Sequence, residues 1–430
     1  MARWSFPNRS ATAGGAAELF FPQREVLGIQ CETFSPGVIS RVVLAAVETR
    51  SFARAEVVLK SIGEIDISGR HVGRIAGQHG RRLIDRQRQR AEAHRRKELP
   101  VEVENPPGLA VVEMDGGRIR TRQPGHGPGT HQPAWRETKN ALFLRMSSEI
   151  HAEDPCPELP DSLQNRNRLR QLVLEMSGTA DGVPDAGRDQ KDQPEEHALI
   201  TVGDRYSGPQ RLMRTCLSSL DEVHAFGRLM TAEAHRKGFG EAPRRAFVAD
   251  GMACNWGVWQ RHFAGYVPIV DFLHAVSYVY HAAVAVGGGA AEDGQDFGWG
   301  LCLEWTRALW QGRVSDVLAE LAEWQRGQPP VTEEEGEAVC GAGAGEEDPR
   351  RRVQAAVTYL TNNQSRMDYP RYRREGLPLT SSLMESLVKE INWRVKGSEK
   401  FWNDPDGATP MLALTAAALS DDSRLESALT

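Results

Sequence analysis

The chain has 430 residues, enough for two or three domains of ordinary size. With 40% hydrophobic and 26% charged residues it can bury a core, which excludes a fully disordered or a fibrous protein. A net charge of -6 excludes a uniformly basic protein of the histone kind, although it leaves room for local basic surfaces.

The first part of the chain predicts a small helical domain. Residues 1–35 are poorly patterned and are expected to be a disordered or truncated segment. Apolar residues then recur at three- and four-residue steps over 36–98, which predicts short helices of a helix-turn-helix-like DNA-binding domain. A basic run at its end contains Arg86 and Arg90. This run is either a solvated helix or linker, or a segment that contacts phosphates.

The middle of the chain alternates β and helical patterns. Residues 178–196 predict a loop. Strands are expected at 109–115, 135–146, 212–220, 245–250 and 267–271, and helices at 222–237 and 272–286.

The last third is mainly helical. Residues 286–349 predict a helical insertion with a helix pair at 301–326 and an acidic, disordered loop at 331–349. Ordered structure is expected again over 350–402. Residues 403–430 are weakly patterned and are expected to form a tail.

The cysteines and apolar runs indicate the compartment. The six cysteines are far apart and form no C-x-x-C pair, so neither a zinc ribbon nor a disulfide framework is expected. No signal sequence stands at the start, which predicts a cytoplasmic protein. The most apolar stretch, 264–291, is interrupted by Pro268, Asp271 and His274, so no membrane partner is expected.

Three carboxylates are candidates for chemistry. Asp115 and Asp250 each end an apolar strand and each precede a glycine, and sites in open α/β sheets form at the carboxyl ends of strands. Glu385 lies on a helical face with Lys389 and Lys396, which suits a surface that holds metal and phosphate together. Each has a plainer interpretation. An Asp-Gly pair is often only a turn, and Ser382-x-x-Glu385 matches a capping box.

A basic and aromatic cluster surrounds Glu385. Its tyrosines, Tyr369 and Tyr372, either stack on unpaired bases or belong to the core. Asp271 and His274 form a second polar pair, which could orient a neighbour, bind metal or be satisfied within the core. The DNA-binding candidates in this region are Arg371, Arg373, Arg374, Lys389 and Lys396.

These motifs resemble the DDE transposases of bacterial insertion sequences, nearest to the ISKra-type group related to Mutator-like transposases. The resemblance spans roughly 36–402, although the Cys-rich start of such relatives is reduced here to Cys31. It is carried by Asp115-Gly-Gly-Arg-Ile, Val248-Ala-Asp-Gly251, Ile269-Val-Asp-Phe-Leu-His274, Tyr359-Leu-Thr-Asn-Asn363 and Met384-Glu-Ser-Leu-Val-Lys389.

The resemblance implies an α/β fold with an RNase H-like core, in which helices flank a mixed five-stranded sheet of order 3-2-1-4-5. The core would comprise 105–285 and, after the insertion, 350–402 with the glutamate helix. Asp115, Asp250 and Glu385 would hold two Mg²⁺ or Mn²⁺ ions. Asp271 is the rival for the second position, but strand four pairs directly with strand one, about 4.8 Å away, which favours Asp250. Asp271 and His274 would then be accessory residues.

The implied activity is cutting and joining of DNA phosphodiester bonds at the terminal inverted repeats of an insertion sequence and in target DNA. Because two ends are joined, a homo-oligomer is expected. Two other hypotheses stay open from the sequence: a catalytically silent DNA-binding protein derived from a transposase, and an RNase H-like nuclease that cuts without joining.

Overall fold

The computed structural model describes residues 34–121, 134–176, 208–288, 297–329, 348–396, 402 and 405–429. Nearly all of the expected N-terminal segment 1–35, the loop 178–196 and nearly all of the acidic stretch 331–349 therefore lie outside the described residues. The chain divides into two compact units. One unit comprises 1–88, 118–136 and 391–430, and the other comprises 89–117 and 137–390.

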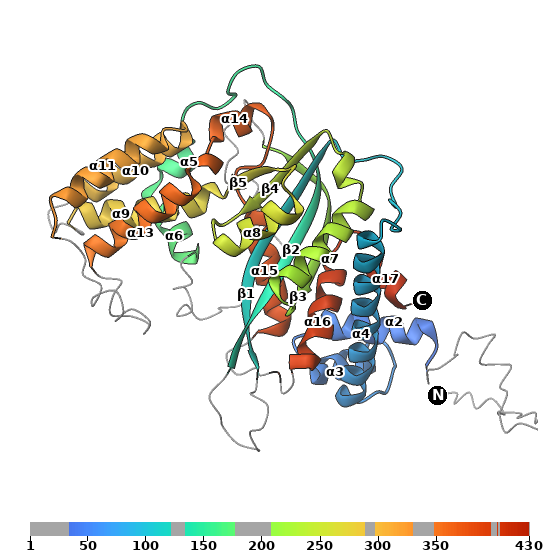
Figure 1. Cartoon of the computed structure of the whole chain (residues 1–430). Coiled ribbons are helices and arrows are strands. Elements are labelled where there is room, and N and C mark those ends of the chain that lie inside the picture. Colours follow the sequence, from blue (N-terminus) through green and yellow to red (C-terminus); the bar gives the residue numbers. More distant parts are fainter. Residues whose placement is uncertain are drawn as a thin grey trace, which may run out of the picture. The chain divides into compact units, whose positions relative to one another are not determined.

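A mixed five-stranded sheet dominates the larger unit (Figure 1). Its order is β3-β2-β1-β4-β5, with β2 and β3 antiparallel and with β4 parallel to both β1 and β5. This is the RNase H-like arrangement that the family resemblance implies. The strands are β1 (Leu109–Thr121), β2 (Ala134–Ser147), β3 (Gln210–Ser219), β4 (Arg244–Ala249) and β5 (Val267–Val270).

The sheet forms where the sequence has buried, apolar strands. All residues of β1 from Leu109 to Met114 are buried, as expected for a central strand that is covered on both faces. Helix α8 (Ala253–His262) packs on β4, where the Phe247 ring lies 6.2 Å from the Trp256 ring. Helix α7 (Val223–Arg236) packs on α8, and the short helix η5 (Phe239–Glu241) leads into β4.

Helices then separate β5 from the last helix of the core. Helix α9 packs against α10, α13 and α6, and α13 also packs against α11. The expected helices at 272–286 and 301–326 are thereby confirmed, the latter as α10 and α11. The bounds are α5 (Asp161–Gln164), α6 (Arg166–Met176), α9 (Phe272–Val286), α10 (Phe297–Trp310), α11 (Val314–Arg326), α13 (Pro349–Asn363), η7 (Gln364–Arg366), α14 (Tyr369–Arg374) and α15 (Ser382–Val395).

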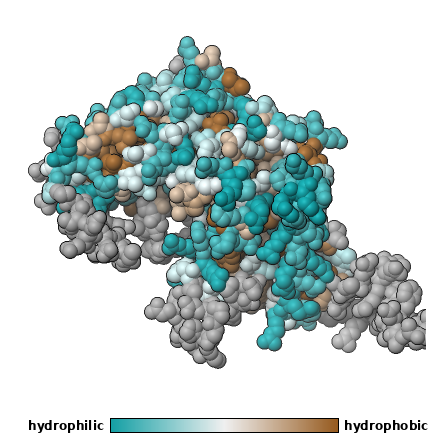
Figure 2. Space-filling view, viewed as in Figure 1, coloured by the Kyte–Doolittle hydropathy of each residue, from teal (hydrophilic) through white to brown (hydrophobic). Residues whose placement is uncertain are grey.

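The smaller unit contains α2 (Pro36–Val47), α3 (Phe52–Ser61) and most of α4 (Gly69–Arg95). The basic run is therefore mainly helical rather than a linker. Its arginines Arg81, Arg82 and Arg88 are exposed, and the side of α4 that faces the viewer is mostly hydrophilic in Figure 2. None of the described helices is long and apolar enough to cross a membrane.

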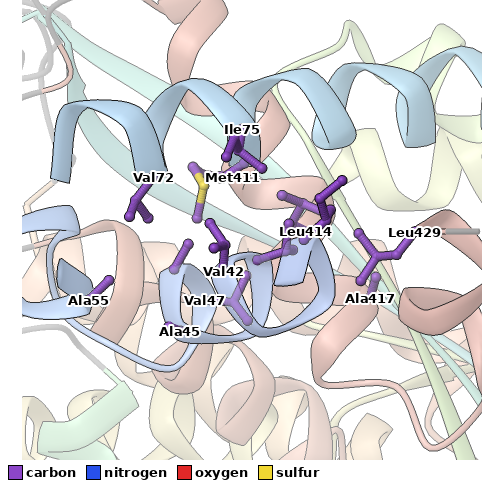
Figure 3. Packing of buried hydrophobic residues seen from close by; sticks show 14 of the residues in the cluster. Val42, Ala45, Val47, Ala55, Val72, Ile75, Met411, Leu414, Ala417 and Leu429 are labelled. Atoms are coloured by element: carbon purple, nitrogen blue, oxygen red, sulfur yellow. The ribbon is translucent and has the colours of Figure 1, made fainter. Parts of the chain in front are cut away.

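The C-terminal segment corrects the expectation of a weakly patterned tail. It contains α16 (Pro405–Ala418) and α17 (Arg424–Leu429), and both helices pack against α2. Met411, Leu414 and Leu429 are buried in one core with residues of α2, α3 and α4 (Figure 3). The pattern is hard to recognise because α16 is apolar around most of its circumference rather than amphipathic.

We expect Leu414→Ala to destabilise the smaller unit by about 2–5 kcal/mol, because it leaves a cavity at a fully buried site. The same substitution at Leu44, which is 48% exposed on α2, is the matched control and should cost less than about 0.5 kcal/mol. Urea denaturation followed by circular dichroism measures both. Equal effects of the two substitutions would show that α16 does not belong to this core.

Candidate active site

Two aspartates lie side by side on adjacent strands of the sheet. Asp250 directly follows β4, as predicted, whereas Asp115 lies in the middle of β1, which continues through Gly116 and Gly117 to Thr121; the predicted end of this strand at Asp115 was therefore wrong. The strands pair in parallel with Met114 opposite Ala249, so the residues that follow, Asp115 and Asp250, are neighbours across the sheet. Burial and, to a smaller extent, the negative charge of Asp250 raise the pKa of Asp115 to about 6. The Gly116 N–H donates to Asp115 Oδ1 at 2.6 Å, and this hydrogen bond lowers the pKa of Asp115. The pair is thus a concentration of negative charge that a cation would relieve.

The loop after β4 fixes Asp250. Its Oδ1 accepts hydrogen bonds from the Met252 N–H at 3.0 Å and from Asn255 Nδ2 at 2.8 Å. Gly251 has φ +100°, and a Cβ there would lie 2.6 Å from the Tyr359 ring. The Tyr359 hydroxyl donates to the Asp250 carbonyl oxygen at 2.8 Å. The turn after β4 therefore requires glycine at position 251, and it holds the Asp250 carboxylate at the end of the strand.

Asp271, the rival for the second catalytic position, is fully buried, and both of its carboxylate oxygens accept hydrogen bonds from within the chain. Its Oδ1 caps α9 by accepting the His274 N–H at 2.9 Å. Its Oδ2 accepts the Ser381 N–H at 2.5 Å and the Ser381 hydroxyl at 2.7 Å. Asp271 thus ties the start of α9 to the start of α15. Its accessory role in the site stays a prediction.

Glu385 is not part of a capping box. The N–H groups of Met384 and Glu385 both donate to the Ser381 carbonyl oxygen, so Ser381 is the N-cap and Glu385 lies one position beyond the one a capping box requires. The Glu385 side chain instead extends to His274, with 3.9 Å between Oε1 and Nε2, and each side chain is 24% exposed. The charge of His274 also lowers the pKa of Asp115. His274 therefore lies near both Asp115 and Glu385.

Glu113 is a further acidic residue of this site that the sequence analysis missed. It lies two positions before Asp115 on β1, so both side chains point to the same face of the sheet. Burial raises its pKa well above the usual value, and the charges of Asp271 and Glu385 add to this, against a hydrogen bond from the Met384 N–H. Glu113 thus contacts the first turn of the helix that carries Glu385. The signal available in the sequence was an acid within the apolar run 109–114.

The donor set fits a divalent cation at the aspartate pair. Two carboxylates, one with a raised pKa, are the oxygen ligands that Mg²⁺ and Mn²⁺ prefer. In the part of the chain that the structure describes, no three His, Cys, Asp or Glu side chains gather closely enough to hold one ion. Glu385 is instead paired with His274.

The basic residues divide into structural and exposed ones. Arg373 corrects the sequence prediction: it is fully buried, its Nε donates to Asp154 Oδ1 at 2.8 Å, and its guanidinium lies 4.1 Å from the Trp310 ring. It therefore cannot contact DNA. The other DNA-binding candidates from the sequence, all at least partly exposed, are Arg86, Arg90, Arg371, Arg374, Lys389 and Lys396.

Several of these candidates have partners within the chain. Arg371 Nε donates to Glu375 at 2.7 Å, Arg86 donates to the Ser427 carbonyl oxygen at 2.6 Å, and Arg90 lies 3.9 Å from Glu102. Tyr369 and Tyr372 are core residues, because both are buried and donate to carbonyl oxygens of β5.

The raised pKa of Asp115 predicts a pH-dependent stability. The folded state keeps the Asp115 proton up to about pH 6, whereas the unfolded chain releases it near the ordinary value of 3.8. Stability is therefore lost as pH rises from about 4 to about 6, by up to about 3 kcal/mol. Asp115→Asn should remove this loss, and its gain over the wild type should appear at pH 7.5 and vanish at pH 4.

Urea denaturation in EDTA at these two pH values measures the effect, and Glu153→Gln, at an exposed acid of the same unit, is the matched control. A gain of equal size at both pH values, or the same gain in the control, would contradict the expectation.

Comparison with known proteins gives few matches. No family model matches the chain, and no curated protein matches it. Among solved structures, the chain is similar to the Drosophila P element transposase strand transfer complex. The TM-score is 0.33 and the sequence identity 10%, over 94% of this chain and 96% of that chain.

Proposed function

We propose that this chain is a metal-dependent DNA transposase, which cuts and joins phosphodiester bonds at the ends of an insertion sequence. The observation that carries the proposal is the juxtaposition of Asp115, on β1, and Asp250, directly after β4, across two adjacent parallel strands. The RNase H-like strand order and the ordered sequence motifs support it.

Asp115 and Asp250 would hold divalent cations, Mg²⁺ or Mn²⁺, and Glu385 is the third ligand in the proposal. Two such ions, when bound, would activate the attacking oxygen and stabilise the leaving 3′ oxygen of the phosphodiester. The loop hydrogen bonds to Asp250 keep one carboxylate in place before any ligand arrives. Preorganisation of this kind lowers the cost of assembling the site.

The remaining groups have supporting roles in the proposal. His274, whose Nε2 lies 3.9 Å from Glu385 Oε1, would orient the glutamate toward the aspartate pair. Asp271 and Glu113 fix the first turn of α15, from which Glu385 projects. Exposed bases such as Arg374 and Lys389 offer positive charge to the DNA backbone, and because such contacts release counterions, DNA affinity should fall steeply with salt.

Cleavage of a labelled duplex that carries the repeats flanking the chain's own coding sequence tests the proposal. We expect nicking with Mg²⁺ or Mn²⁺, none with EDTA, and joined products when a second duplex is added. The inactive control is Asp115→Asn. Binding without cutting under every metal condition would contradict an enzyme and favour a silent DNA-binding protein. Cutting with no joined product would favour a nuclease.

A further inference from the structure

A cavity of about 490 Å³ opens beside the candidate active site. Gly251, the residue after Asp250, lines it, together with Tyr278 of α9 and one face of α13. The carbonyl oxygen of Asp250 accepts a hydrogen bond from Tyr359, another lining residue. The cavity is therefore continuous with the loop that positions Asp250.

Two stacked tyrosines form part of its wall. The rings of Tyr278 and Tyr359 are nearly parallel, with 3.9 Å between centroids and 13° between planes. The hydrogen bond from Tyr359 to the backbone of Asp250 fixes the inner ring, and Tyr278 is only half-buried. The pair offers a rigid aromatic surface of the kind on which a planar ring stacks.

The polar groups of the cavity come from α13. Gln354 and Asn362 are both exposed. The Gln354 amide is engaged within the chain, since its Oε1 accepts from Gln325 Nε2 at 2.8 Å and its Nε2 donates to Thr358 Oγ1 at 3.3 Å. The Asn362 amide provides a donor and an acceptor. Arg351 adds a guanidinium, which suits a phosphate group. Asn363, the neighbour of Asn362, is structural because its Oδ1 accepts from Trp256 Nε1 at 2.8 Å. The Tyr359–Asn363 motif of the sequence thus supplies both the wall of the cavity and an unburied amide.

We propose that this cavity receives one unpaired nucleobase of the DNA held at Asp115 and Asp250. The inference rests on the proposed function. The base stacks on Tyr278, the amide of Asn362 meets its edge, and Arg351 faces the neighbouring phosphate. Met252, 52% exposed on the same loop, provides an apolar group that can fill the gap left in the duplex. A free nucleotide presents the same ring, but the continuity with the Asp250 loop favours a base from bound DNA.

The test compares two duplexes in EDTA, where no cleavage is expected. One carries a single bulged 2-aminopurine, and the other has the same base paired. We expect the full chain to bind the bulged duplex roughly tenfold more tightly and to quench its fluorescence by stacking. Tyr278→Ala should lose this preference while binding the paired duplex normally, and Asn362→Ala should weaken it. Tyr278→Phe, which keeps the ring, and Thr361→Ala, at an exposed position outside the cavity lining, should retain it.

Three results would overturn the inference: equal binding of the two duplexes by the wild type, an unchanged preference in Tyr278→Ala, or saturable binding of free adenosine monophosphate that Tyr278→Ala removes. The last would identify a site for a free nucleotide. Magnesium-dependent nicking, with Asp115→Asn as its control, is scored separately. Nicking without a base preference refutes only the inference, and absence of nicking refutes the proposed function.

Discussion

Asp250→Asn is expected to reduce metal-dependent nicking on the order of a thousand-fold with almost no loss of stability. The asparagine Oδ1 can still accept from the Met252 N–H and from Asn255, so the loop after β4 should keep its conformation. What disappears is a negative charge beside Asp115. A loss of several kcal/mol in charge stabilisation corresponds to a rate loss of this size.

Asp271→Asn is the matched variant, because it makes the same change in the rival aspartate. Both carboxylate oxygens of Asp271 accept hydrogen bonds inside the protein, so an amide would turn an NH₂ group toward a donor. We expect a loss of about 1–3 kcal/mol in stability and a smaller loss of nicking, roughly tenfold. Nicking rates and melting temperatures, measured together, separate the two roles. If Asp250→Asn nicked normally and Asp271→Asn were inactive at unchanged stability, the roles would be reversed.

The apolar strands that carry the two aspartates are the part of this site that sequence can predict. A short apolar run that stops at Asp-Gly indicates the strand and the position of the carboxylate, as the runs before Asp115 and Asp250 do. The end of the strand follows from the run only at Asp250, because β1 continues past Asp115 to Thr121. The strand order came from the resemblance to a family, since periodicity says nothing about which strands pair. Once β1 and β4 are adjacent, the register alone makes the two aspartates neighbours.

Other features could not be predicted because they depend on contacts between distant segments. Glu113 looks like an interruption of an apolar strand until the N-terminus of α15 is placed against it. The N-cap of α15 also depends on a distant contact. Ser382 and Glu385 have the spacing of a capping box, but the hydrogen bond from Ser381 to Asp271 makes Ser381 the N-cap. The core role of Leu414 depends on packing with α2, α3 and α4, far away in the sequence.

Arg373 shows how composition alone misleads, and it gives the second large expected effect. In the run 366–374, Arg373 and Arg374 are equivalent by charge, yet Arg373 is fully buried and Arg374 is exposed. Arg373 bonds Asp154 and the Trp310 carbonyl oxygen, the latter at 3.0 Å, and its guanidinium covers the Trp310 ring. Helix α14 thus directs one arginine into the core and the next one outward.

We expect Arg373→Ala to destabilise the chain by about 3–5 kcal/mol, because it leaves Asp154, only 17% exposed, without its cation. Arg374→Ala is the control on the neighbouring residue and should leave stability unchanged. Its effect should fall on DNA binding, with a weaker affinity and a salt slope reduced by about 1. Urea denaturation and DNA titrations at several salt concentrations measure both variants. If Arg373→Ala kept its stability and lost DNA affinity, the buried arginine would belong to the DNA-binding surface after all, since a residue that only holds α14 in place cannot act without a cost in folding.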